Sequence, residues 1–300
     1  MVLQSEMMEK AKDYTGSGEK AIFLLQPICK EYIWGKENWL FSSLHSEVGE
    51  APFLIKEILA KEALSLQVHP EDDFAGREEG SQGKTEMWYI LDCSPEAYLY
   101  YGLKHKVTEE ELAKRIVNGT ILEICRKVPV NKGDVFYLPA GIIHAIGPGI
   151  RLLEVQQNSN LTYRIYDYGR KNEANQLRPL HIRQALQVSS CHPPLFGHEP
   201  MNCRTQEEGY YKTLLVQCPY FKVTLYEVLK ELTLDGTDSQ TALVVLEGKG
   251  ELKTAVQTMR VEEGDTLLLS PLAELYKLTG KVTAVVVHAS PTSASQALGS

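Results

Sequence analysis

The 300-residue chain lacks the charge pattern of a nucleic-acid or membrane-surface protein. Its 31 Lys and Arg residues against 39 Asp and Glu residues leave a net charge of −8, and no block of like charges interrupts the sequence. Nucleic acids and anionic membranes select basic surfaces, so neither is expected as a partner. No apolar run is long enough to span a bilayer, and residues 1–20 carry charges where a signal peptide has its apolar core.

Paired cysteine motifs are also missing. The six cysteines are scattered along the chain without a CxxC pair or a short regular spacing. This arrangement argues against a zinc ribbon and against a disulfide-stabilised scaffold. We therefore expect reduced thiols and a cytoplasmic protein.

Short β-branched and aromatic runs, separated by Gly, Pro, Asn and Asp clusters, dominate the sequence. Such spacing is typical of antiparallel sandwiches and barrels rather than of βαβ units. The fold is thus predicted to be mainly β. The expected strands are 53–58, 63–68, 86–91, 98–101, 134–138, 151–156 and 162–166, followed by 213–217, 221–229, 241–247, 266–269 and 282–287.

A small helical insertion over residues 106–128 interrupts this pattern. Thr108-Glu-Glu-Glu111 is a capping-box sequence followed by apolar residues at helical spacing, with Asn118-Gly119 as a stop signal. Residues 120–128 are expected to form a second helix that ends before Pro129. The Pro-, Gln- and Ser-rich stretch from Leu177 to Gln206 is expected to be a connector with little regular structure.

The chain divides on this basis into two predicted β-domains, residues 20–190 and residues 200–290. The two halves share a Gly-Asp-strand-Pro pattern, which begins at Gly133 in the first and at Gly264 in the second. The second copy has no histidine equivalent to His144. We expect it to keep the barrel and to lack a metal.

Three segments of the first domain carry residues typical of a metal site. Residues i and i+2 of a strand share a face, so Gln67 and His69 point together, as do Lys84 and Glu86. His144 follows the turn in Gly133-Asp-Val-Phe-Tyr-Leu-Pro139-Ala-Gly141-Ile-Ile-His144 and is expected to face the barrel interior. Two imidazoles and a carboxylate are ordinary zinc ligands, and a glutamine oxygen would be a weak, neutral fourth.

The same segments resemble a known family. Gly133-x5-Pro139-x-Gly141-x2-His144 resembles the second cupin motif, and Gln67-x-His69 with Glu86 resembles the first motif as modified in type I mannose-6-phosphate isomerases. Further stretches are similar to the short bacterial and archaeal-type members of that family. They are Glu31-Tyr-Ile-Trp34-Gly35, Ser65-Leu-Gln67-Val-His69-Pro70, Gly83-Lys84-Thr-Glu86-Met-Trp88-Tyr, Val155-Gln-Gln-Asn158-Ser159 and Thr162-Tyr-Arg164-Ile-Tyr-Asp167-Tyr.

The resemblance implies a double cupin fold, with two β-barrel or jelly-roll domains, and a zinc-dependent aldose–ketose isomerase. Such an enzyme interconverts mannose 6-phosphate and fructose 6-phosphate through an enediolate. By the family pattern Gln67, His69, Glu86 and His144 hold one zinc ion per chain. Lys84 lines the pocket, and Arg164 lies over the reacting end of the sugar.

Several alternatives stay open from the sequence. The catalytic base could be Lys84, a metal-bound water or a metal-bound carboxylate, and the phosphate could be bound by Lys84, Arg164 or Arg170. A non-catalytic sugar-phosphate-binding cupin, or an isomerase of another phosphorylated aldose, is the alternative function. An iron or manganese cupin is disfavoured, because it predicts two or three histidines in the first motif. We expect a monomer.

Overall fold

The computed structural model describes residues 20–171 and 175–290, which fall into two compact units. The central unit contains residues 28–39 and 54–199. The C-terminal unit contains residues 200–290 together with two earlier segments, 20–27 and 40–53. The N-terminal segment thus joins the later part of the chain because β1 (Ile22–Leu25) pairs with β19 (Thr266–Leu269).

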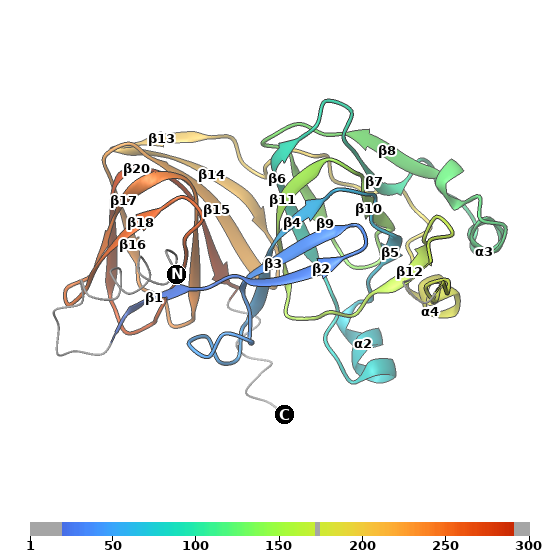
Figure 1. Cartoon of the computed structure of the whole chain (residues 1–300), viewed down its shortest axis with the longest axis horizontal. Coiled ribbons are helices and arrows are strands. Elements are labelled where there is room, and N and C mark those ends of the chain that lie inside the picture. Colours follow the sequence, from blue (N-terminus) through green and yellow to red (C-terminus); the bar gives the residue numbers. More distant parts are fainter. Residues whose placement is uncertain (1–19, 172–174, 291–300) are drawn as a thin grey trace. The chain divides into compact units, whose positions relative to one another are not determined.

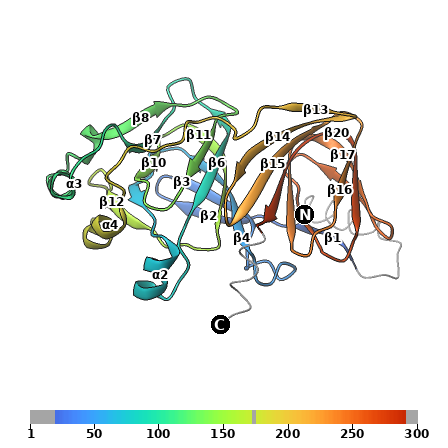
Figure 2. The same ribbon diagram turned by 180° about the vertical axis from the view of Figure 1, so that it is seen from behind.

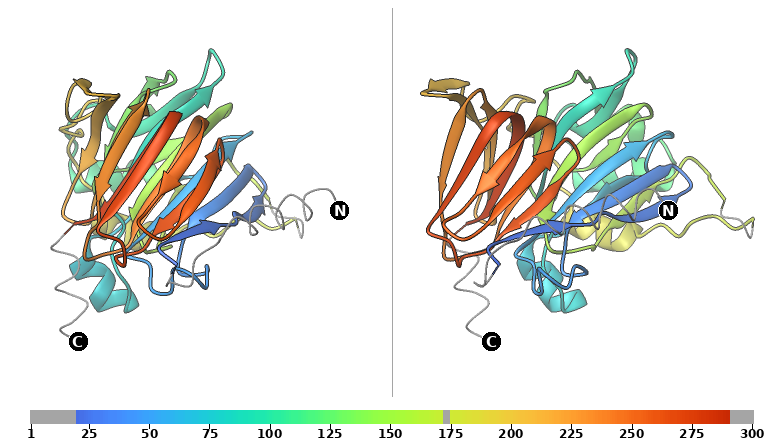
Figure 3. Two further views of the ribbon diagram at one scale, coloured as in Figure 1. Left: turned by 90° about the vertical axis from the view of Figure 1, so that its left-hand side faces the viewer. Right: turned by 60° about the vertical axis from the view of Figure 1, so that its left-hand side comes forward.

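The C-terminal unit is built on one nine-stranded antiparallel sheet (Figure 1; Figure 3 shows its strands side by side). Seven strands follow the order β1-β19-β17-β20-β15-β14-β13, while β16 pairs with β20 and β18 pairs with β17. Leucine, valine and tyrosine side chains fill its core, including Leu243, Leu267 and Val286. The remaining strands are β13 (Thr205–Glu207), β14 (Tyr210–Gln217), β15 (Phe221–Val228), β16 (Glu231–Asp235), β17 (Thr241–Lys253), β18 (Thr258–Glu262) and β20 (Leu275–Ala289).

The central unit consists of two sheets, visible from behind in Figure 2. The six-stranded sheet has the order β2 (Ile28–Tyr32), β3 (Gly35–Phe41), β4 (Phe53–Ala60), β11 (Ile150–Gln157), β6 (Glu86–Cys93) and β9 (Val135–Leu138). The five-stranded sheet has the order β12 (Tyr163–Tyr166), β5 (Leu66–Val68), β10 (His144–Ile146), β7 (Tyr98–Leu103) and β8 (Cys125–Pro129). The prediction of a mainly β, cupin-type fold is confirmed.

Strand β5 shows how the alternation of side chains separates core from cavity. Leu66 and Val68 are fully buried in an apolar cluster with Leu103, and Gln67 between them points to the opposite side, where it lines a cavity. This is the facing that the i, i+2 rule predicted. The face of the five-stranded sheet that carries Gln67 is therefore turned toward the cavity.

Only the first of the two helices predicted for the insertion is found in the structure. Helix α3 (Glu109–Val117) begins as predicted, because the Thr108 side chain accepts a hydrogen bond from the Glu111 amide at 3.1 Å. The predicted second helix is wrong: a three-residue 3₁₀ turn at Ile121–Glu123 is followed by strand β8. Pairing of β8 with β7 buries Cys125 and Val128, and this tertiary contact outweighs the local helical pattern.

Two other helices were not predicted. Helix α2 (Asp72–Glu79) follows β5, and helix α4 (Ile182–Val188) lies within the stretch that we expected to be irregular. Helix α4 is short and is stabilised by packing of Ala185 into the same apolar cluster as Leu66. None of the helices within residues 20–171 and 175–290 is long and apolar enough to cross a bilayer.

The β2–β3 hairpin depends on Gly35. Its φ is 144°, and an added Cβ would lie 2.0 Å from the carbonyl oxygen of Leu59. We expect Gly35→Ala to lower the free energy of unfolding by at least about 2 kcal/mol, through backbone strain and steric overlap. Gly76→Ala, within α2 and with nothing near the added Cβ, is the matched control and should be neutral or stabilising. Equal denaturant midpoints for the two variants would contradict this account of the hairpin.

Candidate metal centre and active site

Three strands bring His69, Glu86 and His144 together in the central unit. Glu86 begins β6, His144 begins β10, and His69 follows β5 directly. One ligand atom from each lies within 4.8 Å of the others, and the three residues are 1% exposed or less. Glu86 Oε1 lies 3.2 Å from His144 Nε2, and Glu86 Oε2 lies 3.6 Å from His69 Nε2. The structure therefore brings these three sequence-predicted residues together.

Backbone carbonyls orient both imidazole rings. His69 Nδ1 donates to the Leu161 carbonyl and His144 Nδ1 donates to the Ile142 carbonyl, each at 2.8 Å. Donation from Nδ1 leaves the Nε2 lone pairs directed at the centre of the cluster. Trp88 packs edge-on against His144 with ring centroids 5.2 Å apart, which further restricts that ring.

The chemistry of this cluster fits a divalent metal ion. His69 Nε2 and both Glu86 oxygens are buried without a hydrogen bond, and the Glu86 oxygens have only ion-pair contacts, with Lys84 and the imidazoles. Burial, together with the Lys84 ammonium, lowers the pKa of His69 well below its ordinary value, so the imidazole remains neutral and able to bind a cation. A cation between these atoms would satisfy all three at once.

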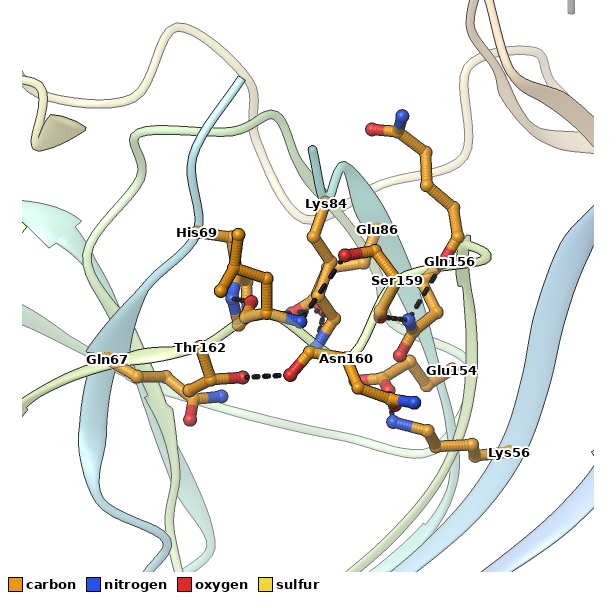
Figure 4. A network of polar contacts seen from close by, with 12 residues as sticks. Lys56, Gln67, His69, Lys84, Glu86, Glu154, Gln156, Ser159, Asn160 and Thr162 are labelled. Carbon is orange, nitrogen blue, oxygen red and sulfur yellow. Dashed lines mark hydrogen bonds and ion pairs between the residues drawn. The ribbon is translucent and has the colours of Figure 1, made fainter. Parts of the chain in front are cut away.

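Gln67 and Lys84, predicted as the fourth metal ligand and as a pocket residue, lie beside the cluster. Gln67 faces His144 across the β5–β10 pairing, with 3.4 Å between its Nε2 and His144 Nε2. Lys84 Nζ lies 3.1 Å from Glu86 Oε2, and its side chain is buried. Burial would raise the pKa of Glu86, but the Lys84 ammonium and the two imidazoles hold it well below the usual range. Figure 4 shows Lys84, Glu86 and His69 gathered beside Gln67.

A cavity of about 510 Å³ opens beside this cluster, and Gln67, Lys84 and Arg164 are part of its wall. Its charged lining comprises five basic side chains, Lys30, Lys56, Lys84, Arg164 and Arg178, and two acidic ones, Glu37 and Glu154. In a protein of net charge −8, this is a local excess of positive charge. Such a pocket attracts an anionic small molecule.

Arg164 reaches the cavity from β12, opposite Gln67 in the β5–β12 pairing. Its Nη1 donates to the Pro179 carbonyl at 2.9 Å, and its buried Nε has no partner. Burial and the nearby Arg178 guanidinium lower the pKa of Arg164. Arg170, which the sequence offered as a phosphate ligand, is not among the described residues that line the cavity.

The sequence reasoning missed a buried ion pair on the opposite wall. Lys56 Nζ lies 3.1 Å from Glu154 Oε1, and Trp88 Nε1 donates to Glu154 Oε2 at 2.9 Å. Burial would lower the pKa of Lys56, but the carboxylates of Glu154 and Glu37 raise it. The signal was present in the sequence, because Lys56 is a charged residue inside the apolar strand Phe53–Ala60.

Comparison with known proteins gives a consistent result. Residues 211–289 match the family model described as the cupin domain of mannose-6-phosphate isomerase. The chain is 37% identical over 257 residues to the mannose-6-phosphate isomerase ManA of Bacillus subtilis, covering 85% of this chain and 80% of that protein. It is 34% identical to the mannose-6-phosphate isomerase of Streptococcus mutans, covering 85% and 79%.

Solved structures show the same relationship. The crystal structure of mannose 6-phosphate isomerase from B. subtilis superimposes with a TM-score of 0.82 at 28% identity, covering 90% of this chain and 100% of that one. A putative mannosephosphate isomerase from Archaeoglobus fulgidus, at 18% identity and a TM-score of 0.70, covers 92% of this chain and 100% of its own and shares the fold.

Removal of the one anionic ligand tests the metal centre. We expect Glu86→Gln to weaken binding of a divalent metal more than about 100-fold, because the remaining imidazole and amide groups are neutral. Metal content after equilibrium dialysis, measured by elemental analysis, provides the comparison. Glu78→Gln, on the exposed face of α2, is the control and should bind metal as the unchanged protein does. Stoichiometric metal in Glu86→Gln would show that the ligand set is wrong.

Proposed function

The chain belongs to the type I mannose-6-phosphate isomerase family, and from this premise we propose that it interconverts mannose 6-phosphate and fructose 6-phosphate with one bound zinc ion. The observation that carries the proposal is the convergence of buried ligand atoms of His69 and Glu86, none of which makes a hydrogen bond, beside a cavity with excess positive charge. The family relationship supplies the reaction, and the cavity supplies the sign of the substrate.

We assign the metal to His69, Glu86, His144 and Gln67. Zinc suits this donor set because two neutral imidazoles, one carboxylate and a weak amide oxygen leave room for a substrate oxygen. When bound, zinc acts as a Lewis acid that polarises the carbonyl and hydroxyl oxygens of the sugar.

The isomerisation moves a carbonyl between C1 and C2 of the sugar. A proton leaves the carbon next to the carbonyl, an enediolate forms, and a proton returns to the neighbouring carbon. We assign the proton transfer to Lys84, whose amine lies on the cavity wall beside the candidate ligands. Arg164 would stabilise the negative charge of the enediolate, since its guanidinium faces the same cavity with an unsatisfied Nε.

The proposal also covers the cellular location and the oligomeric state of the protein. All six cysteines are free thiols, which suits a reducing compartment, and we propose a cytoplasmic protein. We keep the expectation of a monomer, which light scattering of the purified protein tests directly.

Chelation should remove the activity. We expect turnover of mannose 6-phosphate to fall more than about 100-fold after treatment with a chelator and dialysis, and to return when zinc is added. The same treatment followed by magnesium is the control, because a site with two imidazoles disfavours that ion. Bound zinc without turnover of either sugar phosphate would contradict the substrate assignment, and other phosphorylated aldoses would then be assayed.

Substitution of the proposed catalytic residues should separate chemistry from metal binding. Lys84→Met preserves the length of the side chain and removes the amine, so we expect kcat to fall about a hundredfold to ten-thousandfold. Deuterium incorporation at C2 of mannose 6-phosphate in D2O should fall in parallel, with metal content unchanged. Arg164→Ala should also lower kcat with full metal content, whereas Lys61→Met at an exposed position should leave it unchanged. Full exchange in Lys84→Met would assign the proton transfer to another group.

A further inference from the structure

Two arginines contact one buried carboxylate beside the cavity, and a third arginine lies nearby. Asp167 is 5% exposed, and its Oδ1 contacts the guanidinium groups of both Arg170 and Arg178. Arg164, on the adjoining strand, is close enough for its charge to interact with Asp167, Arg170 and Arg178. One carboxylate against three guanidinium groups leaves a local excess of two positive charges, which is the composition of an anion-binding site.

The three arginines differ in how far they are already engaged. Arg170 donates Nη1 to the Ala63 carbonyl, Nε to the Asp167 carbonyl and Nη2 to the Asp167 carboxylate, so its hydrogen-bonding capacity is largely committed to the protein. Arg178 makes a single long contact among the described residues, 3.4 Å from Nη1 to Asp167 Oδ1. Arg178 lines the cavity, so most of its planar fork of N–H donors remains available.

The strand pairing places Asp167, and the two arginines that contact it, away from the metal ligands. Ser65, Gln67 and His69 follow one another at spacings of about 6.6 Å along the β5 segment. Strand β12 runs antiparallel to β5, with Arg164 opposite Gln67 and Tyr166 opposite Leu66 (Figure 1). Asp167 is therefore carried toward the Ser65 end, and the bond from Arg170 to the Ala63 carbonyl anchors it there.

A hexose 6-phosphate matches this separation of the metal ligands from the arginines. Its reacting carbons, C1 and C2, lie at one end of the molecule and the phosphate on C6 lies at the other. With C1 and C2 beside Gln67, Lys84 and the metal ligands, the phosphate points along β5 toward Ser65, where the arginine group lies.

We propose that Arg178 binds the phosphate of the substrate, and that Asp167, fixed by Arg170, positions its guanidinium. This inference rests on the proposed function, in that it takes the substrate to be a phosphorylated sugar. A guanidinium fork binds two phosphate oxygens through parallel N–H bonds in a fixed plane, whereas a lysine ammonium acts as a point charge. The same bidentate contact makes Arg178 a determinant of selectivity for phosphorylated over free sugar.

The opposite wall offers a competing location that the contacts disfavour. Lys56 is paired with Glu154 and also lies 3.8 Å from Glu37, so nearby carboxylates already balance its charge. Lys30 is stacked on the Trp39 ring, with its Nζ 3.2 Å from the ring centroid. Each would have to give up an existing interaction to bind phosphate.

Arg178→Ala in the zinc-loaded full chain tests the proposal. We expect KM for mannose 6-phosphate to rise about 10- to 100-fold, and the inhibition constant of inorganic phosphate to rise by a similar factor, with kcat changing less than about threefold. Arg178→Lys should give an intermediate increase, because it keeps the charge and loses the fork. Arg183→Ala, at an exposed position of α4, is the matched control and should change neither constant.

The outcomes separate the inference from the function on which it rests. Unchanged KM and unchanged phosphate inhibition in Arg178→Ala would overturn the inference while the isomerase assignment stands. The same result combined with a large shift in Lys30→Ala would move the phosphate to the opposite wall. If the unchanged protein binds inorganic phosphate by calorimetry but turns over neither sugar phosphate, the proposed function fails. A loss of that binding in Arg178→Ala would then still support the phosphate site.

Folding of the variant is monitored separately. Arg178→Ala should keep the thermal midpoint and the zinc content of the unchanged protein, since Arg170 continues to hold Asp167. If Arg178→Ala unfolds, KM and the inhibition constant of phosphate are measured in Arg178→Lys and Arg178→Gln instead. A KM unchanged in both of these variants would overturn the proposal.

Discussion

The burial of Glu86 is the constraint on which the rest of the central unit depends. A carboxylate with no solvent exposure is costly to bury unless cations and donors surround it. Here Lys84 lies 3.1 Å away and two imidazoles present nitrogen atoms to the same two oxygens. A divalent ion at their centre would complete the charge balance, so ligand geometry and fold stability depend on the same atoms.

This constraint also ties the strand register to function. Glu86 pairs with Gln156, and His144 pairs with Gln67, in ladders of opposite sheets. A slip of one residue would replace the polar side chain by an apolar neighbour, Met87 in β6 or Leu66 or Val68 in β5, and would turn the polar side chain toward the core. Backbone carbonyls of Leu161 and Ile142 determine which imidazole nitrogen is free, so two loop segments would influence the binding of a metal ion through the orientation of the rings.

The basic residues that line the cavity fall into two groups, one held in ion pairs and one that keeps hydrogen-bond donors for a ligand. Lys56 and Lys84 are each held by a buried carboxylate, whereas Arg164 and Arg178, which also line the cavity, keep N–H donors without a partner among the described residues. A pocket with every cation paired would have no net attraction for a sugar phosphate. The division therefore explains how an acidic protein can still recognise an anion, because the excess positive charge is local and close to the reacting groups.

The sequence by itself determined the class of fold and indicated the residues that meet at the candidate metal site. Alternation along β5 and the start of β6 indicated which side chains share a face, and the capping box at Thr108 predicted the start of α3, because both signals act over two to four residues. Tertiary structure decided what depends on distant partners. Residues 125–129 became a strand by pairing with β7, β1 joined the later strands through β19, and Arg178 rather than Arg170 reached the cavity because Arg170 is held by Asp167 and Ala63. Such outcomes depend on competition between contacts far apart in the chain, which local patterns do not encode.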